Sequence, residues 1–497
     1  MKRSLVAVAA ALALLIAPAA LAGPSLHVGA VEDAAVWQNP DAEMDLARLA
    51  GFDSIRMTAQ WTNGTTVLPP GQVSRLQRAA IAASMRGLNP IVSMYNASSA
   101  STPIDPSARA QFVEFAKSTV RVLPWVTTFI VGNEPNSSAY WQPQFDASGG
   151  DAAAQSYEQL LAETYDGIKQ ARPTATVIGG ALDSHGSDNP ANHPSHSPTT
   201  FIRDLGLAYR ASGRKAPLMD VFDAHVYGDT SALPPSMPHT NGTAITEGDY
   251  GKLVALLGTA FDGTAQKGST LPILYGEYGV ESAIPSAKAP LYSGTEAAKT
   301  VDEATQGAYY AEAFRLALCQ PNVIGIMVFH TVDERSLGAW QSGPYYTDGS
   351  PKSDLQAIRA GAVAARSGTA AACPDRTAPS VAISTADGTI AAVAADAVGV
   401  GKVSLYVNGS LADVRYASPY TFGWRPKRPG SYTLEVRAAD AAGNVGRSIA
   451  RVAAAHAPRA DAGQPSPWQF RRVRAPRARE PHRRIPHPRA GRAAARR

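Results

Sequence analysis

Two glutamates each stand directly after an apolar run, and carboxyl chemistry is the first reaction type they suggest. Glu134 belongs to an Asn-Glu-Pro sequence that ends one run, and Glu277 lies near the end of another. Cleavage of a glycosidic bond needs one carboxyl group to protonate the departing oxygen and a second to meet the developing oxocarbenium centre. The pair therefore predicts one carboxyl group that acts as an acid and one that acts as a nucleophile, if the fold brings the two groups to about 5 to 5.5 Å.

The elements that must position this pair follow a regular alternation. From about residue 25 to about residue 368, short apolar runs alternate with longer segments of helical periodicity, which predicts parallel strands joined by helices. Eight such units predict an α/β fold, a (β/α)8 TIM barrel at residues 23–368. A doubly wound open sheet is the alternative, but no Gly-rich phosphate turn follows the first run. The expected strands are residues 26–31, 52–58, 90–96, 126–133, 176–183, 221–227, 273–280 and 323–331.

The barrel would place the two glutamates on one face. Loops after the strands gather at one end of such a barrel, and Glu134 and Glu277 follow the fourth and seventh strands, which lie across the barrel from each other. Their side chains could then reach the two faces of one sugar ring. Other acidic residues lack this pairing at strand ends and are expected at the surface: Glu32, Asp53, Glu247 and Glu281.

These residues resemble the clan A glycoside hydrolases, most of all the cellulase-like enzymes of family 5, with family 39 also similar. The resemblance covers about residues 25–368. In that clan the glutamate of Asn-Glu-Pro is the acid/base and the glutamate after strand seven is the nucleophile, which implies Glu134 and Glu277. Asn133 would hydrogen-bond the sugar 2-hydroxyl. No cofactor is implied, because the glutamate pair performs the whole reaction.

Supporting residues follow from the same resemblance. Arg56 resembles the strand-two arginine that steadies the nucleophile, and His225 and Tyr227 resemble the His-x-Tyr after strand six. A structural ion pair is the alternative for Arg56, and a buried structural role for His225. Arg56 is expected to favour the ionised nucleophile, whereas Glu134 in a less compensated environment would keep its proton near neutral pH.

Two strands depart from the family pattern. Family 5 enzymes have a histidine near strand three, where this chain has Tyr95 and Asn96, and a sugar-stacking tryptophan after strand eight, where it has Phe329 and His330. The sugar subsite beside the nucleophile is therefore expected to have a different shape. An aromatic face packs well on the C–H face of a pyranose. Candidates for the missing apolar platform are Trp61, Trp141 and Trp340.

The loop after the fifth strand contains oxygen and imidazole donors that could in principle bind a metal. The intervening Gly, Pro, Asn and Ser residues instead indicate a flexible polar loop, and no metal site is expected. The four donors are Asp183, His185, His193 and His196.

The N-terminus and the cysteines indicate export. Residues 1–22 combine a cationic start, a short apolar run and small residues, which is typical of a secretory signal peptide. No later stretch approaches the ~20 apolar residues that a membrane span requires. In an exported chain the two cysteines, Cys319 and Cys373, favour a disulfide, with two separate buried thiols as the alternative. The expected location is therefore extracellular, with cell-surface association possible.

The C-terminal part differs from the barrel. After a linker at residues 369–376, short alternating strands and repeated turn signals predict a small immunoglobulin-like β-sandwich at 377–455. Residues 456–497 are rich in Arg, Pro and Ala without apolar periodicity, and disorder is expected there.

Charge separates the tail from the rest. The chain carries a net charge of +5, but the twelve arginines and two acidic residues of 456–497 make the tail +10 and leave −5 for everything before it. Nucleic-acid binding by the folded part is therefore not expected, since that part would repel phosphate.

The hypothesis that joins these observations is a secreted, monomeric hydrolase that cleaves a β-linked oligo- or polysaccharide with retention of configuration. Two alternatives stay open. One is a glycan-binding surface protein whose barrel has lost turnover, and the other is a transglycosylase that uses the same residues.

Overall fold

The computed structural model describes residues 26–191, 194–239, 242–369, 373, 377–386, 389–396, 400–416, 418–426, 428–440, 444–456 and 468–472. The signal peptide expected at residues 1–22 and most of the linker at 369–376 lie outside this description. The chain divides into two compact units at residue 373, and each is described by itself.

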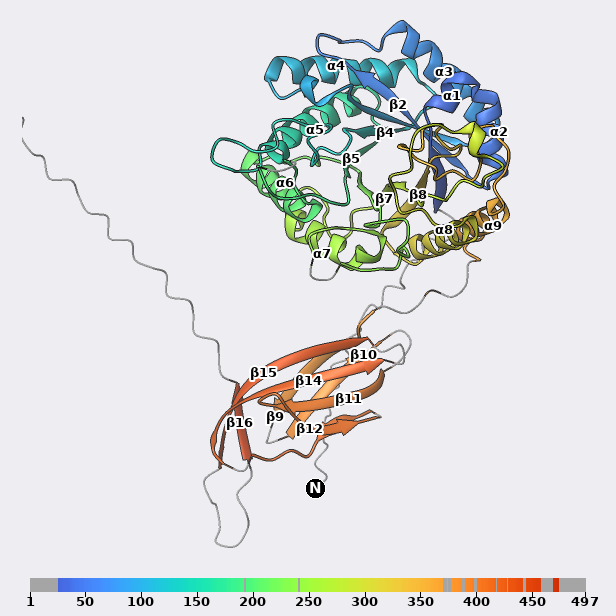
Figure 1. The fold of residues 1–497 in the computed structure, drawn as a ribbon. Coiled ribbons are helices and arrows are strands. Elements are labelled where there is room, and N and C mark those ends of the chain that lie inside the picture. The colour runs from blue at the N-terminus through green and yellow to red at the C-terminus, as the bar shows by residue number, and fades with distance from the viewer. Residues whose placement is uncertain are drawn as a thin grey trace, which may run out of the picture. The chain divides into compact units, whose positions relative to one another are not determined.

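The first unit is a closed barrel of eight parallel strands in chain order, with helices around it (Figure 1). Each strand overlaps a predicted range, so the (β/α)8 prediction is confirmed. The strands are β1 (His27–Val31), β2 (Ser54–Trp61), β3 (Asn89–Asn96), β4 (Thr128–Val131), β5 (Thr176–Leu182), β6 (Val221–His225), β7 (Ile273–Tyr278) and β8 (Val323–Phe329). The α-helices are α1 (Ala34–Gln38), α2 (Pro40–Leu49), α3 (Pro70–Met85), α4 (Pro106–Val122), α5 (Ala152–Ala171), α6 (Pro198–Ser212), α7 (Tyr250–Phe261), α8 (Glu303–Leu318) and α9 (Leu355–Arg366), with short 3-10 helices at Ser99–Ser101, Glu247–Asp249 and Ala289–Leu291.

The strand period of two sorts side chains between the barrel interior and the helices. The interior is filled by a small apolar cluster from seven different strands, whereas the larger core joins the outer strand faces to the helices. On each strand, the residue two positions after an inward-facing residue also points into the barrel, closer to its mouth. The interior cluster contains Val31, Ile91, Ile130, Ile178, Ala181, Val221, Leu274 and Met327.

Aspartate side chains cap the N-termini of several barrel helices. Asp105 accepts hydrogen bonds from the backbone at the start of α4, and Asp151 and Asp302 do the same for α5 and α8. Such caps satisfy N–H groups that have no partner within the helix. No α-helix in the described part of the chain is long and apolar enough to cross a membrane.

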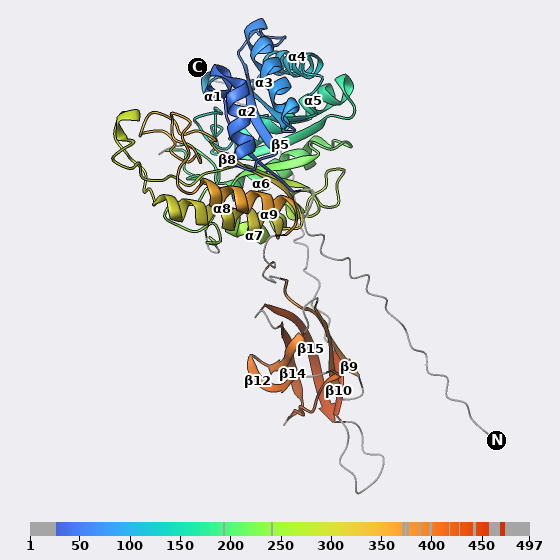
Figure 2. The same cartoon turned by 90° about the vertical axis from the view of Figure 1, so that its right-hand side faces the viewer.

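A disulfide joins the end of α8 to the segment that leaves the barrel. Cys319 and Cys373 are bonded, and the bond encloses β8 and α9. Helices α8 and α9 pack side by side on this flank of the barrel (Figure 2). The cysteine pair expected from the sequence is therefore formed in the structure.

The second unit is a pair of antiparallel sheets that share one apolar core, as the sandwich prediction required. One sheet has the order β13-β10-β9 and the other β12-β11-β14-β15-β16. Ile383, Ile390, Val403 and Leu434 come from both sheets and are buried together. The strands are β9 (Ser380–Ala386), β10 (Thr389–Ala395), β11 (Val400–Val407), β12 (Ser410–Arg415), β13 (Tyr420–Phe422), β14 (Gly430–Asp440), β15 (Val445–His456) and β16 (Trp468–Arg472).

Disorder was expected from residue 456 onward, but residues Trp468–Arg472 form the strand β16. Its backbone pairs antiparallel with β15, from Val452 opposite Arg472 to His456 opposite Trp468. The composition of the tail argued against a packed core, but an added edge strand needs only a neighbouring strand whose backbone groups are free to pair. Residues 457–467 and 473–497 lie outside the described residues.

Candidate active site

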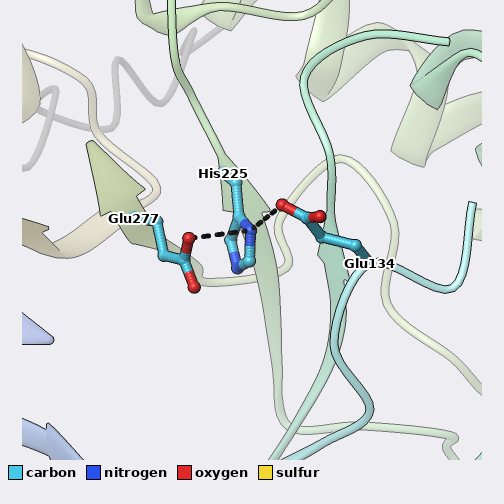
Figure 3. Close-up of side chains that lie close together, drawn as sticks. All are labelled: Glu134, His225 and Glu277. Atoms are coloured by element: carbon cyan, nitrogen blue, oxygen red, sulfur yellow. Dashed lines mark hydrogen bonds and ion pairs between the residues drawn. The ribbon is translucent and has the colours of Figure 1, made fainter. Parts of the chain in front are cut away.

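Glu134 and Glu277 approach each other at the barrel mouth. Glu134 follows β4, Glu277 lies in β7, and His225 at the end of β6 stands between them (Figure 3). One carboxylate oxygen of each glutamate and a ring nitrogen of His225 all lie within 4.8 Å of one another. The side chains of Glu134 and Glu277 are 16% and 10% exposed, so both are screened from bulk solvent yet open to a ligand.

The turn after β4 directs Glu134 to this position. Gly132 and Glu134 both have positive φ, of 91° and 41°, and the Glu134 N–H donates to the Ala181 carbonyl at 2.7 Å. A side chain at position 132 would place its Cβ 2.8 Å from a ring carbon of Tyr157. The turn therefore requires glycine at this position, and the bond to Ala181 holds Glu134 against the neighbouring strand β5.

Two donors fix the carboxylate of Glu277. A terminal guanidinium nitrogen of Arg56 lies 3.0 Å from its Oε1, and the Tyr227 hydroxyl donates to its Oε2 at 2.9 Å. Arg56 is 2% exposed. Both supporting residues expected from the sequence thus contact the predicted nucleophile, and charge-assisted bonds of this kind hold a carboxylate in one orientation.

The other donors of Arg56 tie neighbouring strands to the site. Its Nε donates to Ser93 Oγ at 2.6 Å, and its terminal nitrogens donate to the Gly276 carbonyl and to Asn133 Oδ1, each at 3.0 Å. The guanidinium group therefore links β2 to β3, β4 and β7. Asn133 is oriented by this bond, which sets the direction of its remaining amide group.

His225 links the two glutamates. Its Nδ1 lies 2.9 Å from Glu134 Oε1 and 3.5 Å from Glu277 Oε2, and the ring is fully buried. Burial lowers the pKa of His225, but the charge of Glu277 and the hydrogen bond with Glu134 together raise it above its ordinary value. The ring can therefore donate a hydrogen bond to Glu134. It also separates two carboxyl groups that would otherwise repel each other.

Glu134 holds its proton to higher pH than an ordinary glutamic acid. Burial raises the pKa of Glu134, the hydrogen bond and the charge of His225 oppose this, and the charge of Glu277 raises it further. Arg56, the guanidinium cation of the site, is paired with Glu277. The two carboxyl groups therefore differ in environment in the way that separate acid and nucleophile roles require.

Asp223 is a part of the site that the sequence argument missed. It lies on the inner face of β6, two residues before His225, and its Oδ1 accepts the Gly276 N–H at 2.8 Å. Its Oδ2 has no hydrogen-bond partner among the described residues, and burial raises its pKa. A Cβ at position 276 would lie 2.2 Å from the Asp223 carboxylate, so glycine is required beside Glu277. The alternation Asp-x-His was the available signal.

Tyr140 also belongs to the site and had no sequence signal. Its ring packs edge-on against Tyr95, with centroids 6.2 Å apart. Burial raises the pKa of Tyr140, and the charges of Glu134 and Glu277 raise it further, as expected for a hydroxyl close to both carboxylates. The loop after β4 therefore contributes an aromatic side chain to the site.

Three aromatic side chains form a wall beside Glu277. Tyr227 and Trp340 have ring centroids 4.9 Å apart, and Phe329 packs edge-on against Trp340 at 5.4 Å. Phe329 and Trp340 are half-buried, so part of each ring faces solvent. Of the tryptophans named as candidate platforms, Trp340 is the one that contacts a partner of Glu277.

The platform role predicted for Trp141 and Trp61 is wrong. Trp141 is 1% exposed, donates to Ser156 Oγ and packs edge-on against Tyr157. Trp61 is fully buried and packs against Phe112 of α4. Trp61 lies on the outer face of β2, which the helices cover, and Trp141 lies in the loop after β4 and packs against α5.

Asn96 and His330, two of the residues at which the sequence departs from the family 5 pattern, both bind backbone carbonyl groups. Asn96 is buried and donates to the carbonyls of Ser98 and Tyr140, at 2.7 and 2.8 Å, so it supports the loop that carries Tyr140. The His330 Nδ1 lies 2.9 Å from the Val31 carbonyl, which ties the end of β8 to β1.

The surface location expected for four acidic residues is wrong for Glu32, Glu247 and Glu281, which are 3%, 0% and 8% exposed. The loops after the strands fold over them, and burial of a carboxyl group is tolerated where it accepts backbone N–H bonds or keeps its proton. Glu32 accepts the Asp33 N–H, and burial raises the pKa of Glu281 to about 7. Asp53 is half-buried and pairs with His27 and Arg366.

Among the described residues, the donors close enough to share a cation are those of Glu134, His225 and Glu277, where the Arg56 guanidinium already balances Glu277. In the loop after β5, the His185 ring pairs with Asp229 and the His196 ring lies 2.9 Å from the Gln144 carbonyl, while His193 lies outside the described residues.

The fold and the site define a (β/α)8 barrel with a carboxyl pair at its mouth, followed in the chain by an immunoglobulin-like domain. Residues 377–436 match the family model described as a bacterial Ig domain. No curated protein matches the sequence of this chain.

Several solved structures are similar to this chain. GH5_18 from Streptomyces cattleya in complex with GlcNAc is 16% identical, with 72% of this chain and 84% of that chain covered and a TM-score of 0.48. The exo-β-1,4-mannosidase Op5Man5 from Opitutaceae bacterium strain TAV5 is 16% identical, with 70% and 60% covered and a TM-score of 0.44. A β-glucuronidase from Bacteroides uniformis is 12% identical, with 83% and 43% covered and a TM-score of 0.41, so this chain spans less than half of its length. The activity is therefore inferred from the site.

Proposed function

We propose that this chain is a retaining glycoside hydrolase that acts on a β-linked saccharide. The observation that carries the proposal is the approach of Glu134 and Glu277, since one carboxylate oxygen of each lies within 4.8 Å of the other. Retaining enzymes hold their carboxyl groups about 5 to 5.5 Å apart, whereas inverting enzymes leave about 6.5 to 9.5 Å for a water molecule. The short separation favours direct attack by Glu277.

The first step breaks the bond to the leaving group. Glu134 donates its proton to the glycosidic oxygen, the bond to the anomeric carbon breaks, and Glu277 forms a new bond to that carbon from the opposite face. The raised pKa of Glu134 keeps the proton available for this transfer. Arg56 and Tyr227 hold the Glu277 carboxylate in the attacking orientation.

The second step releases the sugar. Glu134, now ionised, removes a proton from a water molecule, which attacks the anomeric carbon and breaks its bond to Glu277. Two inversions restore the original β-configuration. His225, between the two carboxyl groups, positions Glu134 in both steps through its hydrogen bond at 2.9 Å.

A proton NMR assay with a panel of β-glycans and aryl β-glycosides tests the reaction. The β-anomer is expected as the first product, and it should then mutarotate. Initial release of the α-anomer would contradict the double displacement. Binding of a glycan without turnover of any panel member would favour a non-catalytic glycan-binding protein, and transfer of the sugar to an added alcohol in preference to water would favour a transglycosylase.

Replacement of each glutamate tests the two roles. Glu277→Ala and Glu134→Ala are each expected to lower kcat by at least about 1,000-fold, because removal of a group essential to the chemistry leaves only binding and electrostatic contributions. With added azide and an aryl glycoside that has a good leaving group, Glu277→Ala should form the α-glycosyl azide and Glu134→Ala the β-glycosyl azide. The exposed carboxylate Asp45 supplies the control variant Asp45→Ala, which should retain the wild-type rate.

The extracellular location belongs to the same proposal. It is supported by the signal-peptide pattern at residues 1–22 and is compatible with a disulfide between Cys319 and Cys373. The expected substrate is an oligo- or polysaccharide outside the cell.

A further inference from the structure

Asp33 occupies a position at the barrel mouth that the reaction described above does not use. Val31 at the end of β1 belongs to the interior cluster, and Asp33 follows two residues later. The Thr58 N–H donates to Asp33 Oδ1 at 2.9 Å, and Thr58 itself lies two residues after Arg56 on β2. Residues two apart on a strand share a face, so Thr58 lies on the inner side of the barrel, one level above Arg56. The Asp33 carboxylate lies beside Thr58 through this bond.

The surroundings of Asp33 connect it to the catalytic pair. The Thr58 hydroxyl lies 3.5 Å from the Tyr95 hydroxyl, and Tyr95 in turn packs against Tyr140. Burial raises the pKa of Asp33 above its ordinary value, although hydrogen bonds from Thr58 and the charges of Arg56 and His330 oppose this. The Asp33 carboxylate therefore lies near the guanidinium group that holds Glu277.

The nitrogen donors around this position already have partners. Arg56 contacts Ser93, Gly276, Asn133 and Glu277, and the His225 Nδ1 faces both glutamates. The His330 Nδ1 faces the Val31 carbonyl. A negatively charged sugar would thus meet the Asp33 carboxylate without one of these donors to receive it, and like charges in a partly buried site repel each other.

From this arrangement we infer that Asp33 accepts hydrogen bonds from hydroxyl groups of the sugar bound against Glu277, and that the site selects an uncharged sugar and rejects uronic acids. A sugar hydroxyl can donate to the Asp33 carboxylate, whereas a uronate carboxylate cannot. The aromatic wall of Tyr227, Phe329 and Trp340 supplies the apolar face for the same ring. The inference rests on the proposed glycoside hydrolase function and names its substrate class.

Aryl β-glycosides of glucose, mannose and galactose, each compared with the glycoside of its uronic acid, test the selection. Wild-type protein is expected to cleave at least one neutral member with kcat/KM at least about 100-fold above that of the matching uronide. Asp33→Asn keeps the acceptor for the Thr58 N–H and removes the charge. The ratio of kcat/KM for the neutral glycoside to that for its uronide should therefore fall at least about tenfold. Asp45→Asn, on the outside of the barrel in α2, is the matched control and should leave the ratio unchanged.

Deoxyfluoro glycosides of the preferred sugar test the hydrogen bond itself. Fluorine cannot donate a hydrogen bond, so substitution at the hydroxyl that contacts Asp33 should lower kcat/KM of the wild type about 10- to 100-fold beyond the effect at the other positions. In Asp33→Ala, fluorine at that position should lower kcat/KM no more than fluorine at the other positions does. Far-ultraviolet circular dichroism and thermal unfolding of both Asp33 variants show whether each is folded.

These experiments distinguish failure of the sugar selection from failure of the glycosidase function. Turnover of a uronide at a rate equal to that of its neutral partner, or equal sensitivity of wild type and Asp33→Ala to every deoxyfluoro position, would overturn the selection while the glycosidase function stands. Absence of turnover of every glycoside by the wild type would overturn the glycosidase function, and this inference with it.

Discussion

Glu134 and Glu277 have the same chemical group but different neighbours, and this difference is what divides the two steps of the reaction between them. Arg56 and Tyr227 hold Glu277. Glu134 has His225 as its partner and is buried enough for its pKa to rise. A carboxyl group that keeps its proton can act as an acid, whereas one held by a cation and a hydroxyl is ready to attack.

The raised pKa of Glu134 has a consequence for pH dependence. The acid step needs protonated Glu134, so kcat/KM for a substrate with a poor leaving group should fall as pH rises through a pKa above the ordinary 4.5. A 2,4-dinitrophenyl glycoside, whose leaving group departs without protonation, should keep its rate at pH values where the first substrate has lost activity. Paired pH profiles measure this. Identical alkaline limbs for both substrates would argue against Glu134 as the acid.

At the scale of elements, helices hold the strand ends that carry the site. Tyr157 of α5 reaches between β4 and β5, donates to the Val131 carbonyl at 2.7 Å and accepts the Gly180 N–H at 2.8 Å. Its ring also closes the space beside Gly132, where the turn to Glu134 begins. One helical side chain thus supports the turn that aims the acid/base.

Tyr157→Phe should therefore affect both stability and catalysis. Loss of the hydroxyl leaves a buried N–H and a buried carbonyl without this partner, which costs about 1 to 3 kcal/mol of unfolding free energy. It should also lower kcat, since the turn to Glu134 loses a support. Tyr209→Phe is a matched control, because Tyr209 of α6 is equally buried and its hydroxyl donates to the Ala216 carbonyl away from the site. Urea unfolding should show a loss in both variants, with kcat lowered only in Tyr157→Phe.

At the scale of the whole molecule, the barrel separates stability from chemistry. The catalytic residues lie at the C-terminal ends of the strands, whereas Cys319 lies between the end of α8 and the start of β8, at the opposite end. The bond from Cys319 to Cys373 spans 54 residues of sequence and fastens the last strand and helix of the barrel. A cross-link of this length restricts the unfolded chain.

Removal of the disulfide by Cys373→Ser is expected to lower the free energy of unfolding by about 2 to 4 kcal/mol and to leave kcat unchanged wherever the protein is folded. Denaturant unfolding and steady-state kinetics measure the two effects. Reduced wild-type protein provides the control and should match the variant in stability. A loss of kcat in folded Cys373→Ser would show that the bond also supports the active site.

The sequence by itself determined the barrel, because strand and helix periods are local properties that survive in one dimension. It also located Glu134 and Glu277 at strand ends and, through the family resemblance, named Arg56, His225 and Tyr227, all of which the structure places in contact with the pair.

Tertiary structure decided which side chains reach the catalytic pair and which are covered. Trp61 and Trp141 are buried by helices distant in sequence, and Glu32 is enclosed by the loops after β1 and β8, so a local pattern could not show their burial. Tyr140 and Asp33 reach the site from irregular segments that carry no periodic signal. Burial depends on what packs over a residue from elsewhere in the chain, and that information exists only in three dimensions.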